Sequence, residues 1–172
     1  DWLVEAANDL NQDKIIALFD GRFEWGPRAL GHRSILASPK TQAMADKVNE
    51  KIKFRERFRP FAPACLAQLA DDWFLIPEAG RAMLRYMLCT TNVREEQREK
   101  IAAVCHIDGT ARVQIVNDPQ TALHQVLTHF HEKSGVPILL NTSFNLKGDC
   151  MVSSPVDAIA CFLQSGIDRL YI

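Results

Sequence analysis

Hydrophobic and polar positions follow two different periods along this chain. Apolar residues spaced three or four apart predict helices, and short apolar runs or alternations predict strands. Helices are expected over residues 3–10, 41–50, 66–74, 94–100, 118–134 and 154–164. Strands are expected over residues 14–19, 22–25, 33–37, 83–90, 112–116, 136–140 and 169–172. Since helices alternate with strands from about residue 112 onward, the pattern predicts an α/β fold with crossover helices.

Length and composition place the chain among ordinary globular domains. Its 172 residues fit one domain, and its net charge of −1 gives the whole molecule no general attraction to nucleic acid or membranes. The five cysteines are scattered without a C-x-x-C pair, which is typical of reduced thiols. No apolar run reaches the roughly 20 residues of a membrane helix, and no secretory pattern opens the chain. We therefore expect a cytoplasmic domain, cut from a larger chain because it starts directly in a helical pattern.

Residues 51–59 carry an unusual charge pattern. Lys or Arg occupies every odd position, and the even positions are Ile52, Phe54, Glu56 and Phe58. In an extended chain, five cations would share one face while the apolar residues anchored the other in the core. An anionic ligand would relieve the repulsion among those cations, and Arg suits bidentate phosphate contacts. The alternative is a solvated edge strand whose charges prevent aggregation.

Three further segments could bind a ligand. In the loop 26–34, two glycines bracket Arg28 and would let a ligand approach the backbone closely, although a tight structural turn fits equally well. Residues 141–145 place short polar groups after a buried strand, where open α/β sheets bind ligands; backbone capping is the alternative. In segment 106–114, Arg112 begins a predicted strand, and the lone His106 is expected to be structural.

Together these segments resemble the C-terminal region of the carbamoyltransferases that modify nodulation factors and antibiotics. The resembling strings cover residues 21–36, 49–64, 106–114, 141–145 and 154–158, in the family's order. The resemblance implies a YrdC-like fold, with a twisted mixed sheet and flanking helices. The wider group shares Lys-x-Arg and Ser-x-Asn signatures, which Lys53-Phe54-Arg55 and Ser143-Phe144-Asn145 match. His32 and Asp149-Cys150 depart from the usual residues and leave loop details open.

The resemblance also implies a function. In the family this domain converts carbamoyl phosphate and ATP to carbamoyl-adenylate, and an N-terminal Kae-like domain then moves the carbamoyl group to a substrate hydroxyl. We expect Mg²⁺ to arrive with ATP, without a dedicated protein metal site; Glu24 is a weak metal-ligand candidate. The predicted catalytic residues are Arg28, Lys53, Arg59 and Ser143. The predicted cofactor-binding residues are Arg55, Arg112, Asn141 and Asn145.

Two other functions remain open. Basic residues interleaved with Phe54 and Phe58 could bind single-stranded RNA, although cations and aromatics on opposite faces of a strand would not act together. A nucleotide sensor without chemistry is the second alternative. Exchange of pyrophosphate into ATP that depends on carbamoyl phosphate would distinguish an enzyme from a sensor.

Overall fold

The computed structural model describes residues 1–56 and 58–172. The α-helices are α1 (Trp2–Asn11), α2 (Gln42–Val48), α3 (Arg81–Leu84), α4 (Ala122–Ser134) and α5 (Pro155–Gln164). The strands are β1 (Ile16–Phe19), β2 (Arg33–Ala37), β3 (Ala62–Leu66), β4 (Phe74–Leu75), β5 (Thr91–Val93), β6 (Thr110–Ala111), β7 (Gln114–Val116), β8 (Ile138–Ser143) and β9 (Arg169–Tyr171). A π-helical turn, η1 (Asn49–Lys53), and three 3₁₀ segments, η2 (Ala67–Asp72), η3 (Glu78–Gly80) and η4 (Glu95–Ile101), complete the set.

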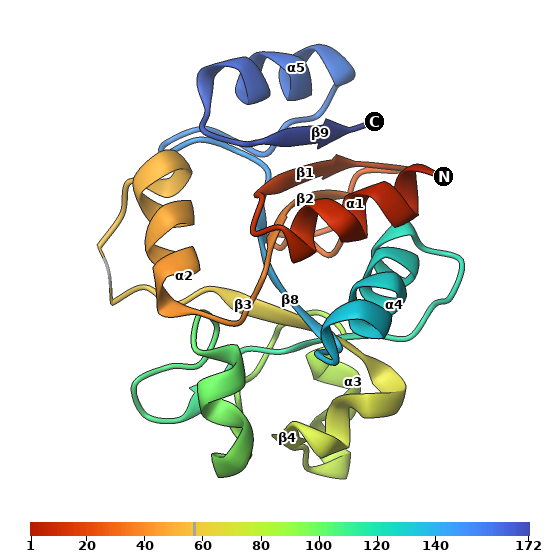
Figure 1. The fold of residues 1–172 in the computed structure, drawn as a ribbon, viewed down its shortest axis with the longest axis vertical. Coiled ribbons are helices and arrows are strands. Elements are labelled where there is room, and N and C mark those ends of the chain that lie inside the picture. The colour runs from red at the N-terminus through yellow and green to blue at the C-terminus, as the bar shows by residue number, and fades with distance from the viewer. Residues whose placement is uncertain (57) are drawn as a thin grey trace.

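Six strands form one mixed sheet in the order β7-β3-β8-β2-β1-β9. Its middle pairs are antiparallel, whereas β7 runs parallel to β3 and β9 runs parallel to β1. Figure 1 shows α1 and α4 side by side against this sheet, with α5 beside β9 and the segment carrying α3 and β4 at the opposite end. The antiparallel strands β4, β5 and β6 form a small second sheet. The predicted α/β fold with a mixed sheet and flanking helices is confirmed.

The helices whose ends carry clear capping residues were predicted best. The Thr41 hydroxyl caps α2 by accepting from the Met44 amide, and Ser154 caps α5 in a capping box with Asp157. Gly135 ends α4 with a left-handed conformation, as a glycine after a helix permits. The start of α4 differs from the prediction, because Thr121 is its N-cap and the preceding Asp118-Pro119 lies in a turn. Among the described residues, no helix combines the length and hydropathy needed to cross a bilayer.

Two strand predictions were wrong, and a third was too long. Residues 22–25 form a loop in which the Glu24 side chain is buried. Residues 83–90 contain the end of α3 and a turn instead of a strand. Of the predicted strand 112–116, only Gln114–Val116 form a strand, β7. The sequence pattern also did not predict β3, an interior strand of the large sheet, because Pro63 argues against a central strand. Since β7 pairs only with Ala64–Leu66, Pro63 is paired with β8 alone.

The predicted extended strand over residues 51–59 was also wrong. The helix α2 continues into the π-helical turn η1, which ends where Phe54 adopts a left-handed conformation with φ of 45°. The Asn49 side chain fixes the next residue, because its Nδ2 donates to the Arg55 carbonyl at 2.6 Å and its Oδ1 accepts from the Arg55 amide at 3.2 Å. Lys51 is exposed and Lys53 is buried, so the cations do not share one face. Arg57 lies outside the described residues.

Candidate functional site

Lys53 lies at the centre of a buried polar network. Its Nζ donates to the Ser143 carbonyl at 2.6 Å and Oγ at 3.2 Å, and to the Asn145 carbonyl at 3.0 Å and Oδ1 at 2.7 Å. The Ser143 hydroxyl in turn donates to Asn145 Oδ1 at 2.6 Å. These three residues, which we call the Lys53 network, join the end of η1 to the end of β8. The two short signatures in the sequence therefore meet in space.

Two opposing influences act on the Lys53 ammonium. Burial, reinforced by the nearby Arg55 guanidinium, lowers its pKa to about 7. The four oxygens around Nζ act in the other direction, because an ammonium donates stronger hydrogen bonds than a neutral amine. Lys53 is therefore a lysine whose pKa lies well below its ordinary value and whose Nζ is surrounded by four oxygens.

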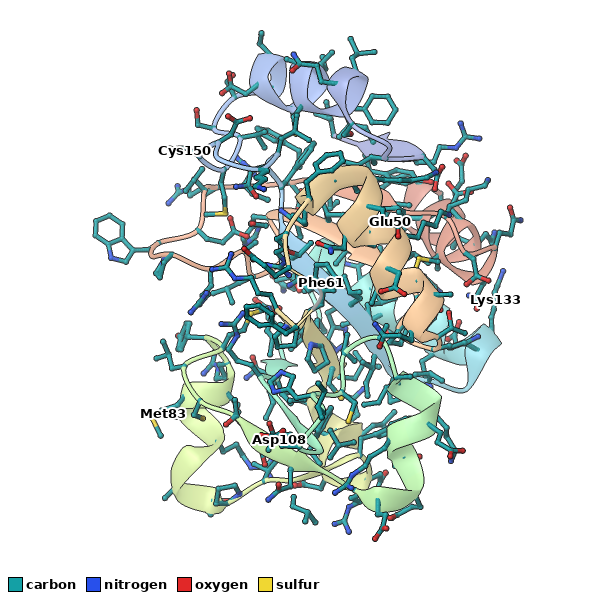
Figure 2. All side chains as sticks on the ribbon, turned by 90° about the vertical axis from the view of Figure 1, so that its left-hand side faces the viewer. Glu50, Phe61, Met83, Asp108, Lys133 and Cys150 are labelled. Carbon is teal, nitrogen blue, oxygen red and sulfur yellow. The ribbon has the colours of Figure 1, made fainter. Side chains whose placement is uncertain are left out.

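Four arginines converge on a neighbouring pocket of about 400 Å³. Its lining comes from the loop before β2, the segment between η1 and β3, the residue before β5, and the segments on either side of β6. The residues are Arg28, Arg55, Arg59, Pro60, Phe61, Thr90, His106 and Arg112. We call Arg28, Arg55, Arg59 and Arg112 the arginine cage. In Figure 2, Phe61 lies near the middle of the molecule and Asp108 lies toward the end formed by the small sheet.

Burial and mutual repulsion disfavour the charged forms of the arginines in the cage. Burial lowers the pKa of Arg55, and the charges of Arg59 and Arg112 add to the effect. Burial likewise lowers the pKa of Arg112, helped by Arg28. The Arg55 guanidinium lies over the Phe61 ring, 4.5 Å from its centroid, where a cation–π contact offsets part of the cost. A polyanion would relieve this repulsion.

A narrow recess of about 90 Å³ extends the pocket toward β8. Arg28, Arg55 and Arg112 line it together with Asn141, Thr142 and Ser143. Ser143 thus connects the recess to the Lys53 network. Lys53 itself lines neither cavity, and Asn145 faces a separate pocket beside α5. The structure therefore brings the predicted cations and polar groups into one region, with Lys53 and Asn145 behind its wall.

A buried carboxylate shapes the loop that carries Arg28. Glu24 Oε1 accepts from the backbone amides of Leu30 and His32, both at 2.8 Å, and of Arg33 at 3.0 Å. Gly31 adopts a φ of 122°, and a Cβ there would lie only 2.8 Å from the Leu123 side chain. Glu24 Oε1 therefore organises the loop backbone, while its Oε2 is buried without a hydrogen-bond partner among the described residues.

Asn141 and Gln114 hold the same loop from the sheet side. The Asn141 amide nitrogen donates to the Ala29 carbonyl at 3.2 Å and to Gln114 Oε1 at 2.7 Å. The Gln114 amide nitrogen donates to the Leu30 carbonyl at 2.7 Å. Asn141 is only 2% exposed, and its Oδ1 has no partner within the described chain. Its donors therefore position the Arg28 loop, while its Oδ1 is the atom left for a ligand.

Unpaired polar atoms concentrate around this pocket. Seven buried side-chain nitrogen or oxygen atoms lack a hydrogen-bond partner within residues 1–56 and 58–172. Four of them belong to residues that line the pocket or its recess, namely Arg55 Nε, Arg112 Nε, His106 Nε2 and Asn141 Oδ1. A buried polar atom without a partner costs about 1–3 kcal/mol. Such a concentration is typical of a binding site, where a ligand supplies the missing partners.

A second, more apolar pocket of about 530 Å³ adjoins the arginine cage. Both cavities share a wall formed by Arg59, Pro60, Phe61 and His106. Phe58 lines the second pocket although its side chain is 75% exposed, and Phe54 is exposed as well, so the prediction that these rings anchor in the core was wrong. Since Phe58 and Arg59 line one cavity, the argument against RNA that rested on opposite faces no longer applies.

Several important residues were not singled out from the sequence. Gln114 and Asn49 act only through contacts with distant or folded-back segments, and nothing in their local pattern indicates this. Phe61 gave a weak signal, because an aromatic residue closes the basic segment. In the described part of the chain, no cluster of three or more His, Cys, Asp or Glu side chains could hold a metal ion. The described residues thus contain no carboxylate cluster of the kind that binds Mg²⁺ directly.

Comparisons with known proteins agree with this geometry. The family model described as "Carbamoyltransferase C-terminus" matches residues 7–172. Nodulation protein NolNO of Sinorhizobium fredii is 40% identical over the whole chain, and nodulation protein NolO of Bradyrhizobium diazoefficiens is also 40% identical over the whole chain. The chain spans 24% and 30% of the lengths of these two relatives.

Solved structures show the same fold at low sequence identity. Full-length HypF, described as phosphate- and nucleotide-bound, aligns with 99% of this chain and 24% of its own at a TM-score of 0.71 and 14% identity. Sua5 of P. abyssi aligns with 98% of this chain and 47% of its own at a TM-score of 0.64 and 15% identity. These likenesses establish the YrdC-like fold, and the family match together with the relatives shows that the chain belongs to the carbamoyltransferase C-terminal family.

Proposed function

We propose that this domain binds ATP and carbamoyl phosphate and forms carbamoyl-adenylate. The observation that carries the proposal is the arginine cage, in which four guanidinium groups converge on one pocket and its recess. Phosphoryl chemistry depends mainly on positioning and on stabilising negative charge, and these side chains can provide both. The HypF structure with a similar fold is described as phosphate- and nucleotide-bound, which supports the choice of ligands.

The sizes of the cavities suggest how the ligands are divided. Carbamoyl phosphate is small enough for the recess beside Ser143, where Arg28, Arg55 and Arg112 would neutralise its phosphate. The unpaired Asn141 Oδ1 is suited to accept from the carbamoyl amide, whose N–H groups find few acceptors among arginines. The ATP phosphates would occupy the larger part of the cage, with Arg59 at its outer end. The nucleoside would lie in the adjoining apolar pocket.

Lys53 and Asn145 lie behind the residues that line the pocket and its recess, and they support the site indirectly. Lys53 fixes the positions of Ser143 and Asn145 and adds positive charge close to Arg55. Because Lys53 lines neither cavity, we assign it an electrostatic and positioning role. Asn145 holds the Ser143 hydroxyl in a fixed orientation.

The proposed reaction balances with one water molecule. Hydrolysis of carbamoyl phosphate gives carbamate and phosphate, and a carbamate oxygen then attacks the α-phosphorus of ATP. Pyrophosphate leaves, and carbamoyl-adenylate is formed. Mg²⁺ bound to the ATP phosphates would reduce their charge during the attack. The residues of this chain bind, align and neutralise the reactants; none is required as a nucleophile.

Transfer of the carbamoyl group to an acceptor hydroxyl belongs to the wider proposal. The chain corresponds to about a quarter to a third of the length of its NolNO and NolO relatives. We assign the transfer step to an N-terminal Kae-like domain, which would receive the adenylate from this domain. The acceptor-binding residues would then lie outside the chain described here.

Exchange of labelled pyrophosphate into ATP tests the proposal. We expect exchange only when carbamoyl phosphate is present, and we expect Arg112→Met to abolish it while Arg85→Met, on an exposed arginine outside the pocket, retains it. ATP binding without exchange would identify a nucleotide sensor. Salt-dependent RNA binding without ATP binding would favour the RNA-binding alternative. That alternative fits less well, because the cage leads into a recess of only about 90 Å³ instead of an extended groove.

A further inference from the structure

His106 lies where the arginine cage meets the apolar pocket. It lines both cavities, in a shared wall with Arg59, Pro60 and Phe61. In any nucleotide the ribose connects the phosphates to the base. If phosphates occupy one cavity and the base the other, the ribose must pass this wall.

Hydrogen bonds fix the tautomer of His106. The Thr110 hydroxyl donates its proton to Asp108 Oδ1 at 2.7 Å. The Thr110 oxygen lies 2.9 Å from His106 Nδ1 and can therefore only accept in that contact. The proton of the neutral ring must then be on Nδ1, which leaves Nε2 as a hydrogen-bond acceptor.

The surroundings keep this ring neutral. Burial lowers the pKa of His106 below its ordinary value, Asp108 opposes the shift, and Arg112 reinforces it. Nε2 is buried and has no partner in the described part of the chain. His106 is thus an unpaired acceptor in a wall whose charged groups are donors. A ligand that carries a hydroxyl group would complete its hydrogen bonding.

We infer that His106 recognises the ribose of the nucleotide, with Nε2 accepting a hydrogen bond from the 2′- or 3′-hydroxyl. The inference rests on the proposed function, because it requires a nucleotide across both cavities. Nε2 is shielded from solvent, so binding must shift the ring or the wall slightly. The domain would then bind a nucleotide that lacks the recognised hydroxyl more weakly than ATP.

Calorimetric titration with four ligands tests this role: ATP, 2′-deoxy-ATP, 3′-deoxy-ATP and inorganic tripolyphosphate. We expect wild type to bind one of the deoxynucleotides about tenfold more weakly than ATP, the usual cost of one hydrogen bond to a buried group. His106→Ala should bind all three nucleotides alike, with unchanged affinity for tripolyphosphate. His129→Ala, on the surface of α4, is the matched control and should behave as wild type.

The outcomes separate this inference from the proposed function. Equal binding of all three nucleotides by wild type would overturn the ribose contact alone, and so would discrimination that persists in His106→Ala. Failure of wild type to bind ATP would overturn both. Tripolyphosphate binding shows that a variant is folded at the site.

As a second variant, Thr110→Val releases the tautomer while keeping the imidazole, and it should reduce the discrimination. The ¹⁵N resonance of His106 Nε2 should move on addition of ATP and stay in place with tripolyphosphate.

Discussion

The Lys53 network and the arginine cage are adjacent but are built in opposite ways. Four protein oxygens lie within 3.2 Å of Lys53 Nζ, so this part of the site is complete within the protein. The arginine cage instead gathers like charges and leaves Arg55 Nε and Arg112 Nε without a hydrogen-bond partner among the described residues. A paired buried network stabilises the fold, whereas an unpaired one stores a cost that a ligand can repay. The comparison predicts that Lys53 and the arginines respond differently to substitution.

Replacing Lys53 should have the largest effect on stability. Lys53→Met keeps the side-chain length but removes the donor from two carbonyls, one hydroxyl and one amide oxygen, so we expect the free energy of unfolding to fall by about 2–4 kcal/mol. Chemical denaturation would measure this change. Lys51→Met, on the exposed side of the same turn, is the control and should cost less than about 0.5 kcal/mol. Equal effects of the two substitutions would contradict the view that the network is structural.

Glu24→Ala should have the second-largest effect on stability. It leaves three backbone amides of the Arg28 loop without their acceptor, and we expect a loss of about 2 kcal/mol in stability together with weaker phosphate binding, since Arg28 loses its support. Thermal unfolding and titration with pyrophosphate would measure the two effects. Glu96→Ala on the exposed side of η4 serves as the control. If pyrophosphate affinity survives the loss of stability, then the loop does not position Arg28 for binding.

How far the sequence predicts these features depends on the range of the contacts involved. The caps of α2 and α5 are local, so residues such as Thr41 and Ser154 marked their helices correctly. The pairing of β3 with β8 is long-range, and it could not be predicted because Pro63 argues against a strand at this position. The sequence drew attention to Lys53 and Ser143 as a ligand site, and the structure does bring them together. It does so through a π-helical turn and a left-handed residue, conformations that an alternating charge pattern does not indicate.

Arg112→Met should change stability in the opposite direction from Lys53→Met. Removing one charge relieves repulsion with Arg28 and Arg55, so we expect a gain of up to about 1 kcal/mol, while pyrophosphate binding weakens at least tenfold. A saturating anion should therefore stabilise wild type strongly and the variant little, as mass action requires. Thermal unfolding with and without pyrophosphate would show both effects, with Arg85→Met as the control. A variant that is less stable than wild type would place the arginine cage among structural elements.

The smallest expected effect is proton uptake by Lys53 during binding. Burial lowers the Lys53 pKa to about 7 in the free domain, and a bound polyanion should raise it by favouring the ammonium. At pH 8.5 the Lys53 side chain of the free domain is mostly neutral and the ligand phosphates are already ionised, so binding should take up close to one proton. Below pH 7, Lys53 is largely protonated before the ligand binds, and binding should take up little. Calorimetric titration of ATP, whose phosphates are fully ionised at pH 8.5, in buffers of different ionisation enthalpy would measure this uptake. Arg112→Met should retain it despite weaker binding, because the titrating group is unchanged. If no proton is taken up at pH 8.5, the four oxygens around Nζ hold the ammonium charged, and the network then presents a permanent positive charge to the cage.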